Sequence, residues 1–253
     1  MHRIAVSFVV VSVLLLALPV MAQEEQGNIA VTAWIKIKPG MEQQYEEGRK
    51  RHVKWHRQHN DPWTWIAWQV ISGENTGMYG VATLGHHWSD FDTEPVPSDA
   101  DEADRRANMA PYVESINITY WAFLPKVSRA YPGESPPAMS SIVFFDVRYG
   151  KSTEFNYLIG KFHEAIGKTN WPANYSWYAL VNGGEGPTYA LVLPRENWAA
   201  FKPQEKPFAQ MLEDAYGRQE ANSLLERLGK VVRSQRSQIH QSRPDLSYIP
   251  AGQ

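Results

Sequence analysis

The chain has 253 residues, of which 43% are hydrophobic and 21% are charged, and its formal net charge is −2 at pH 7. This composition is typical of a globular protein with one large or two small cores, and it excludes disorder along the whole chain. The slightly negative charge argues against a nucleic-acid partner, which requires a cationic surface. Because the chain has no cysteine, histidine, carboxylates, tyrosine, tryptophan or a bound cofactor must supply any chemistry.

The first 22 residues are typical of a secretory signal peptide. His2 and Arg3 precede an apolar run from Ile4 to Leu18, and the residues up to Ala22 suit signal peptidase. The apolar run is shorter than the ~20 residues that span a bilayer, which disfavours the alternative of an uncleaved membrane anchor. We therefore expect cleavage before Gln23, an exported (periplasmic or secreted) protein and no stable membrane anchor after cleavage.

A shift of 110 residues aligns the two halves of the chain without a gap from about Val31 to Asp92. The identical residues in this alignment fall at turns and element junctions, where residue type is most constrained. They are the pairs Gly40/Gly150, Asn60/Asn170, Pro62/Pro172, Gly73/Gly183, Tyr79/Tyr189, Trp88/Trp198 and Phe91/Phe201. We interpret the chain as two copies of one structural unit.

The first copy opens with alternating apolar and polar residues, which predict a strand, and a helix follows after a glycine turn. Two further strands are joined by the glycine-rich SGENTG into a hairpin. Ser89 suits the start of a helix, and Ser98 with Asp101 has the spacing of a capping box. The predicted elements are a strand at about 29–38, a helix at 41–59, strands at 63–71 and 78–84, a helix at 98–114 and a strand at 117–127.

The second copy has the same order of elements. Asn197 suits a helix N-cap, and NGGEGP joins the hairpin. The predicted elements are a strand at about 141–148, a helix at 152–168, strands at 175–181 and 188–193, a helix at 208–228 and a strand at 231–241.

The order strand, helix, strand, strand, helix, strand therefore occurs twice, which predicts an α+β protein of two tandem ferredoxin-like (βαββαβ) units. This arrangement resembles the dimeric α+β barrel superfamily, which includes the antibiotic-biosynthesis monooxygenases, and the resemblance implies an intramolecular pseudo-dimer. That superfamily also contains haem-degrading enzymes and chlorite-dismutase-like haem proteins, so the fold alone does not select a function. We divide the chain into a signal peptide (1–22), a first unit (23–131), a proline-rich linker (132–138) and a second unit (139–253) that serves as a scaffold.

The helix expected at 41–59 carries histidines on the face that its counterpart packs against a sheet. In the alignment His52 matches Phe162 and His56 matches Ile166. Buried imidazoles need hydrogen-bond partners, so they form either a structural network or a ligand pocket, and both alternatives stay open. Gly48 and Gly80 replace larger residues of the second unit, which we interpret as space opened between helix and sheet.

For the pocket alternative, we expect His52 and His56 as catalytic residues, because imidazole titrates near neutral pH and can act as a general base. The helix face and the aromatic strand after it supply candidate ligand-binding residues, and GHHWSDF adds two histidines at the rim. These residues are Tyr45, Trp55, His59, Trp65, His86 and His87.

We expect no cofactor, although two alternatives stay open. The spacings of His52 with His56, and of His56 with His59, let two imidazoles reach one divalent metal ion, and the further ligand would come from His86, His87, Glu74 or Asp90. A haem bound through one of the histidines is the second alternative.

The sequence thus favours an exported protein that binds a small aromatic or apolar molecule. If the protein is an enzyme, a cofactor-free oxygenase-like reaction is the class that we expect. A non-enzymatic structural or binding module of the cell envelope is the alternative. Self-association is compatible with either.

Overall fold

The structure is a computed structural model that describes residues 27–93, 95–133 and 136–251. The predicted signal peptide and its cleavage site lie outside the described residues. Among the helices that are described, none is long and apolar enough to cross a membrane.

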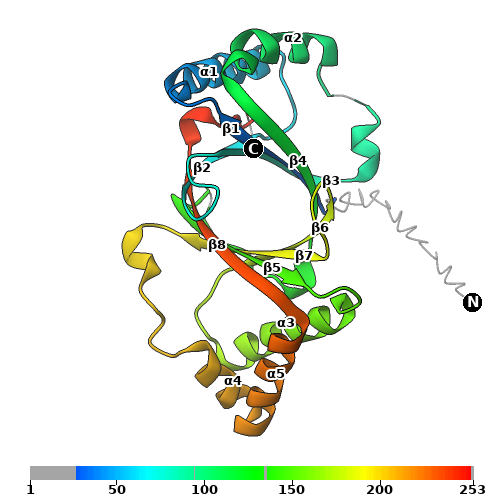
Figure 1. Ribbon diagram of the computed structural model, residues 1–253, viewed down its shortest axis with the longest axis vertical. Helices are drawn as coiled ribbons and strands as arrows, with labels where there is room; N and C mark the ends of the chain where they lie inside the picture. Colours follow the sequence, from blue (N-terminus) through cyan, green and yellow to red (C-terminus); the bar gives the residue numbers. More distant parts are fainter. Residues whose placement is uncertain (1–26, 94, 134–135, 252–253) are drawn as a thin grey trace, which may run out of the picture.

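Eight strands form a closed antiparallel barrel in the order β1-β3-β2-β8-β5-β7-β6-β4 (Figure 1). The first four strands of the chain form one half and the last four form the other, with β2 pairing with β8 and β4 with β6 at the two seams. The strands are β1 (Ile29–Ile37), β2 (Ile66–Ser72), β3 (Tyr79–His86), β4 (Val113–Phe123), β5 (Met139–Val147), β6 (Ser176–Asn182), β7 (Thr188–Arg195) and β8 (Val232–Ser242).

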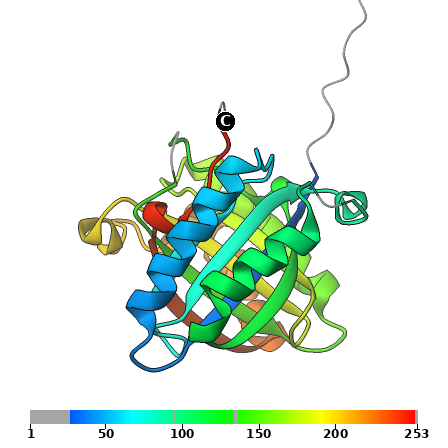
Figure 2. The same ribbon diagram turned by 90° about the horizontal axis from the view of Figure 1, so that it is seen from above.

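Helices cover the outer face of each half of the barrel. Helices α1 and α2 lie over the first half, and α3, α4 and α5 lie over the second half at the opposite end of the molecule (Figure 1). Viewed from above, α1 and α2 run side by side across the strands (Figure 2). Their bounds are α1 (Glu42–Gln58), α2 (Ser98–Asn108), α3 (Ser152–Thr169), α4 (Phe208–Tyr216) and α5 (Arg218–Val231).

The predicted fold class is confirmed, because the order βαββαβ occurs in both halves. Backbone angles match at the predicted shift: Asn60 and Asn170 both have φ of 50°, in the left-handed region that is uncommon outside glycine. Trp88 and Trp198 each begin a short 3₁₀ helix, η1 (Trp88–Phe91) and η4 (Trp198–Phe201). Turns and short 3₁₀ helices therefore occur at equivalent positions, 110 residues apart, in the two halves.

Helix α2 differs from the prediction at both ends. It ends at Asn108 rather than near Glu114, since Pro111 lacks the N–H that a continuing helix requires. Ser98 does not cap it: Pro97 holds the N-cap position without a side-chain hydrogen bond. Asp101 is turned toward α1 instead of toward its own helix end.

Three further boundaries correct or confirm the sequence analysis. The predicted helix at 208–228 is two helices, because Gly217 at φ 80° breaks it. Ser89 lies inside η1, whose N-cap is His87. Asn197 does cap η4, accepting a hydrogen bond from the backbone N–H of Ala200.

Each half of the barrel receives a chain segment from the other half. The C-terminal tail returns to the first half, where Tyr248 pairs with Trp65 and the Nε of Arg49 donates to the carbonyl of Leu246 (3.0 Å). In the opposite direction, Arg129 pairs with Tyr175. The tail belongs by sequence to the predicted unit 139–253 but packs on the first half, so neither half has a complete core alone.

The glycines that we expected to open space instead permit close packing. A Cβ at Gly48 would lie 1.9 Å from the carbonyl oxygen of Asn108, and one at Gly80 would lie 2.1 Å from the ring of Trp68. Gly48 thus lets the end of α2 approach α1. Gly80 makes room for an indole inside the barrel. The sequence interpretation of these two glycines was wrong, because the missing volume is filled by neighbouring atoms.

Replacing Gly48 by alanine should destabilise the protein by about 1–3 kcal/mol, because the clash is with backbone that cannot rotate away. Gly160 in α3 is the matched control, since a Cβ there meets nothing within 4 Å. Gly160→Ala should leave the free energy of unfolding unchanged or raise it by up to about 1 kcal/mol. Urea denaturation of the two variants measures the contrast, and equal effects would contradict it.

The ion pair that anchors the tail should make stability pH-dependent. Arg243 binds both carboxylate oxygens of Glu46 (2.5 and 2.8 Å), and these hydrogen bonds lower the pKa of Glu46 from its usual 4.5. The ionised form is therefore favoured in the folded state, and its stabilisation is present above pH 4.5 and lost as the pH falls through the lowered pKa.

Glu46→Gln should accordingly reduce the free energy of unfolding by roughly 1–2 kcal/mol at pH 7, with the difference from the wild type shrinking below pH 4.5. Glu47→Gln, on the same helix at an exposed position, should change it by less than about 0.5 kcal/mol. Denaturation at several pH values tests both, and a difference that grows on acidification would refute the role of Glu46.

Candidate functional site

A cavity of about 550 Å³ lies between the helices and the sheet of the first half. Strands β1 and β4 supply an apolar wall that includes Val31, Ala33 and Ile116, and α1 and α2 supply the polar wall. Ile116 and its neighbour Ile118 are 47% and 48% exposed. The cavity therefore opens to solvent along β4.

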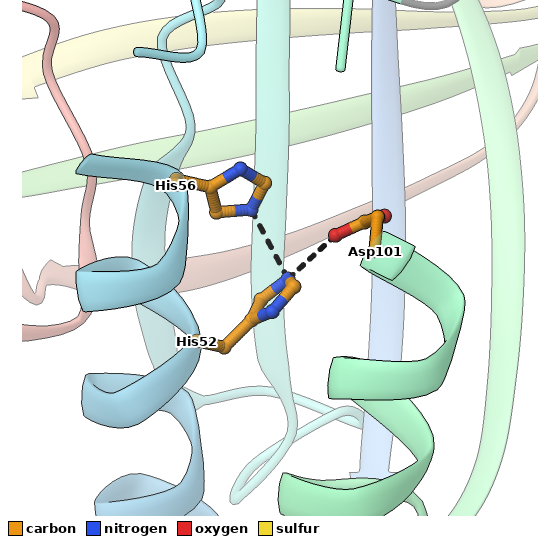
Figure 3. A group of neighbouring side chains, drawn as sticks. All are labelled: His52, His56 and Asp101. Carbon is orange, nitrogen blue, oxygen red and sulfur yellow. Dashed lines mark hydrogen bonds and ion pairs between the residues drawn. The ribbon is translucent and has the colours of Figure 1, made fainter. Parts of the chain in front are cut away.

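Two buried histidines of α1 and three carboxylates form a cluster at this cavity. Figure 3 shows the two histidines with one of the carboxylates, Asp101. The Nε2 atoms of His52 and His56 are 3.1 Å apart, and the Oδ1 atom of Asp101 from α2 lies 3.5 Å from Nε2 of His52. The outer nitrogens also face carboxylates: Nδ1 of His52 lies 2.8 Å from Asp104, and Nδ1 of His56 lies 2.7 Å from Asp61. Every ring nitrogen of the pair thus faces a polar atom.

Asp61 is held by the turn that ends α1. Its side chain is 1% exposed and accepts hydrogen bonds from the backbone N–H of Trp63 and the indole of Trp65, both at 2.8 Å. Burial acts to raise the pKa of Asp61, but the hydrogen bonds from His56 and the two tryptophans outweigh it and lower the pKa. Asp61 therefore remains ionised behind His56.

His52 does not have the basicity that the sequence argument assigned to it. Burial, together with the positive charge of Arg49, lowers the pKa of His52 to about 2. Its imidazole is neutral at physiological pH.

Several buried polar atoms at the cavity have no hydrogen-bond partner among the described residues. These are the hydroxyl of Tyr45, the Nη2 of Arg49, the Oδ1 of Asp101 and the Nδ1 of His56, whose 2.7 Å contact with Asp61 is an ion pair. Burial raises the pKa of Tyr45 to about 12, so its hydroxyl stays a neutral donor. Because an unsatisfied buried polar group costs about 1–3 kcal/mol, the first three of these atoms are suited to partners that enter the cavity.

The structure brings together only part of the predicted site. Tyr45 and Trp65 line the cavity beside His52 and His56. The ring of Trp55 stacks on His52 at a centroid distance of 6.0 Å, and its own backbone carbonyl lies 2.9 Å from Nδ1 of the exposed His59. Neither residue therefore lines the cavity: Trp55 packs against His52, and His59 is exposed to solvent.

The two histidines of GHHWSDF lie elsewhere. His86 is buried beneath Trp63, with Nε2 2.5 Å from the hydroxyl of Thr83. His87 is exposed and caps η1. Neither of them lines the cavity.

Sequence reasoning missed Asp61, Asp101, Asp104 and Arg49. The shift of 110 residues could have found two of them, because it places Asp101 on Met211 and Arg49 on Ile159, both buried in the second half. A charged residue at a position that is apolar core in the other copy is the same signal that identified His52.

The corresponding region of the second half is filled with apolar side chains. They belong to α3, α4 and α5 and to the strands beneath them, and they include Phe155, Leu158, Phe162, Ile166, Met211, Leu212 and Leu224. Phe162 and Ile166 are 8% and 7% exposed, against 2% and 3% for His52 and His56. The two halves therefore share a backbone but differ in whether the helix–sheet interface is a core or a polar cavity.

The barrel lumen holds two smaller cavities of about 300 and 360 Å³. Trp34, Trp68 and His240 line the first, and burial lowers the pKa of His240 to about 3. Asp146 in the second already accepts hydrogen bonds from Thr188, Ser234 and Arg236. The indole Nε1 of Trp68 also lacks a hydrogen-bond partner among the described residues. The helix–sheet cavity is larger and gathers more unpaired polar atoms, so we take it as the candidate site.

Solved structures with similar folds place the chain in a known architecture. A candidate monooxygenase from Lactobacillus acidophilus aligns with a TM-score of 0.55 and 9% identity over 89% of this chain and 97% of that chain. An anthrone oxidase-like protein aligns with a TM-score of 0.51 and 14% identity, covering 90% and 95%. Chlorite dismutase from Candidatus Nitrospira defluvii aligns with a TM-score of 0.53 and 8% identity, covering 87% and 93%.

The chain has the dimeric α+β barrel fold. No protein-family profile matches it, and no curated protein is significantly similar in sequence. At identities this low the similarity establishes the fold alone, and the function of this dimeric α+β barrel has to be argued from its own residues.

Proposed function

We propose that the protein is an oxygenase-like enzyme whose substrate is a flat aromatic molecule with an oxygen substituent, bound in the helix–sheet cavity. The observation that carries the proposal is the contrast between the two halves: one interface is an apolar core, and the other is a cavity whose buried polar atoms lack partners among the described residues. Its volume of about 550 Å³ lies in the range of small-molecule sites.

The walls of the cavity suit a molecule with one apolar and one oxygen-bearing side. Val31, Ala33 and Ile116 offer an apolar surface, and Trp63 and Trp65 offer aromatic edges. Tyr45 and Arg49 offer unpaired donors to an oxygen of the ligand. An analogue without that oxygen would bind more weakly, because the two donors would then be buried without a hydrogen-bond acceptor.

The residues also suit the first chemical step of an oxygenation. Removing a proton from an activated C–H or O–H group of the bound molecule leaves an electron-rich anion that reacts with dioxygen. The guanidinium of Arg49, which is 4% exposed, stabilises negative charge on the ligand oxygen. The imidazole–carboxylate cluster beside it accepts the proton.

Anthrone is a suitable probe, because one of the proteins with this fold is anthrone oxidase-like. Its oxidation, C14H10O + O2 → C14H8O2 + H2O, can be followed by oxygen uptake. Binding can be measured separately by quenching of tryptophan fluorescence. A protein that binds the probe without oxidising it would be a binding module, which is the alternative function.

Tyr45→Phe should weaken probe binding about 3- to 10-fold while preserving stability. The hydroxyl has no partner to lose among the described residues, and phenylalanine is the residue at the equivalent position 155 of the second half.

His52→Phe combined with His56→Ile copies the second half further, and it should abolish both binding and oxidation by filling the cavity. Unchanged probe affinity in both variants would refute the proposed site. A stable double variant that still oxidises anthrone would refute the role of the cluster.

We also propose that the protein is exported, on the basis of the apolar run that follows Arg3. Expression of the full chain in a bacterial host should yield protein that begins at Gln23 outside the cytoplasm. N-terminal sequencing checks this, and protein that retains Met1 in the membrane fraction would contradict it.

A further inference from the structure

We propose that His52, His56 and Asp101 bind a divalent first-row transition-metal ion. The inference deepens the proposed function, since the ion would lie at the wall of the same cavity, but metal binding can be tested without turnover. One nitrogen from each imidazole and one carboxylate oxygen lie within 4.8 Å of one another, and they face a common centre (Figure 3).

The spacing of these atoms suits a shared ion. Neighbouring ligands on a tetrahedral ion with bonds of 2.0–2.1 Å are roughly 3.3 Å apart. The two Nε2 atoms are 3.1 Å apart, and Asp101 Oδ1 is 3.5 Å from Nε2 of His52. The third pair of ligand atoms, from His56 and Asp101, lies within 4.8 Å, so binding would draw Asp101 and His56 toward each other.

The hydrogen atoms of the two imidazoles give an independent argument. A neutral imidazole carries one N–H, so it can donate from one nitrogen only. If both Nδ1 atoms donate to Asp104 and Asp61, two lone pairs face each other across 3.1 Å. If one N–H turns inward instead, the Nδ1 lone pair of that ring faces a carboxylate at 2.8 Å or less. A cation between the Nε2 atoms removes the conflict.

The residues behind the histidines match the support that metal-binding imidazoles usually have. Such histidines donate their other N–H to a carboxylate, which fixes ring orientation. Asp104 is held by the side-chain amide of Asn108 (3.0 Å), and Asp61 is held by its hydrogen bonds from the two tryptophans. Both carboxylates are therefore positioned before an ion arrives.

The local charge also favours a cation. Asp61, Asp101 and Asp104 contribute three negative charges, and the buried Arg49 contributes one positive charge. Arg105 and Arg106 both pair with Glu102, so these three residues add one positive charge. The sum of −1 attracts a cation, which would also give a ligand bond to Oδ1 of Asp101, an atom without a hydrogen-bond partner among the described residues.

Two imidazoles and one carboxylate form a ligand set that suits Fe²⁺, Co²⁺ and Zn²⁺ and leaves further positions open. These positions face the cavity, so an oxygen of the bound molecule or a water can occupy them. Mg²⁺ and Ca²⁺ prefer oxygen ligands and should bind far more weakly.

The experiment uses tag-free protein, because a histidine tag would bind the same ions. After dialysis against a chelator, Co²⁺ is titrated in while its visible absorption is recorded, and Zn²⁺ binding is measured by calorimetry. We expect one ion per chain and a thermal midpoint that rises with Zn²⁺ concentration.

Three variants locate the site, and two further variants serve as controls. Asp101→Asn should weaken Co²⁺ binding at least 10-fold, and His52→Phe with His56→Ile should abolish it. Asp104→Asn, which alters only the support of His52, should weaken binding about 10- to 100-fold. Tyr45→Phe and the exposed control His59→Gln should leave Co²⁺ affinity within about 2-fold of the wild type.

Absence of stoichiometric Co²⁺ and Zn²⁺ binding would overturn the inference, and the cluster would then hold a shared proton instead. Binding that is unchanged in Asp101→Asn and in the double histidine variant would also overturn it. If the double variant does not fold, the Co²⁺ affinity of Asp101→Asn is the test: unchanged affinity overturns the inference. Protein that binds neither Co²⁺ nor Zn²⁺ but still binds and oxidises anthrone would refute the metal inference alone, whereas a metal-binding protein without affinity for aromatic probes would refute the proposed function alone.

Discussion

The burial of two imidazoles on one face of α1 is the constraint on which the first half of the molecule depends. His52 and His56 occupy positions that are apolar core in the second half, and each is at most 3% exposed. Buried imidazoles require polar partners, and two separate segments supply them: the turn after α1 with Asp61, and helix α2 with Asp101 and Asp104. Tyr248 of the tail donates a hydrogen bond to the backbone carbonyl of Asp61 (2.7 Å), so the tail supports the cluster from behind.

The closed barrel explains how one half can carry a polar cavity without loss of the fold. Both halves share two seams, and each half receives a segment of the other, so the apolar packing of the second half stabilises the whole barrel. The interface beneath α3, α4 and α5 is dense, with Phe155, Leu158 and Met211 fully buried. The first half is thereby relieved of the need for a complete apolar core. Unpaired buried donors and acceptors can persist there at a cost of about 1–3 kcal/mol each.

The chemistry of the site follows from its side chains rather than from its architecture. Proteins of this fold include a candidate monooxygenase, an anthrone oxidase-like protein and a chlorite dismutase, at identities of 8–14% with this chain. Here the neutral hydroxyl of Tyr45, the buried guanidinium of Arg49 and the imidazole–carboxylate cluster converge on one cavity. Donors for a ligand oxygen lie beside the imidazole–carboxylate cluster, and this arrangement is the basis of the proposed oxygenase-like function and of the proposed metal site.

The sequence by itself determined the α+β class, the twofold order of elements and the inward face of α1, because hydrophobic periodicity and glycine turns are local properties. It also singled out His52 and His56, since an internal copy showed what those positions normally hold. Only the tertiary structure decided what surrounds them. Asp61, Asp101 and Tyr248 are 5, 45 and 192 residues from His56 along the chain, and no local pattern relates such distances. The same reason explains the error at Gly48: whether a missing side chain leaves a cavity depends on what packs there, and here that is the backbone of Asn108.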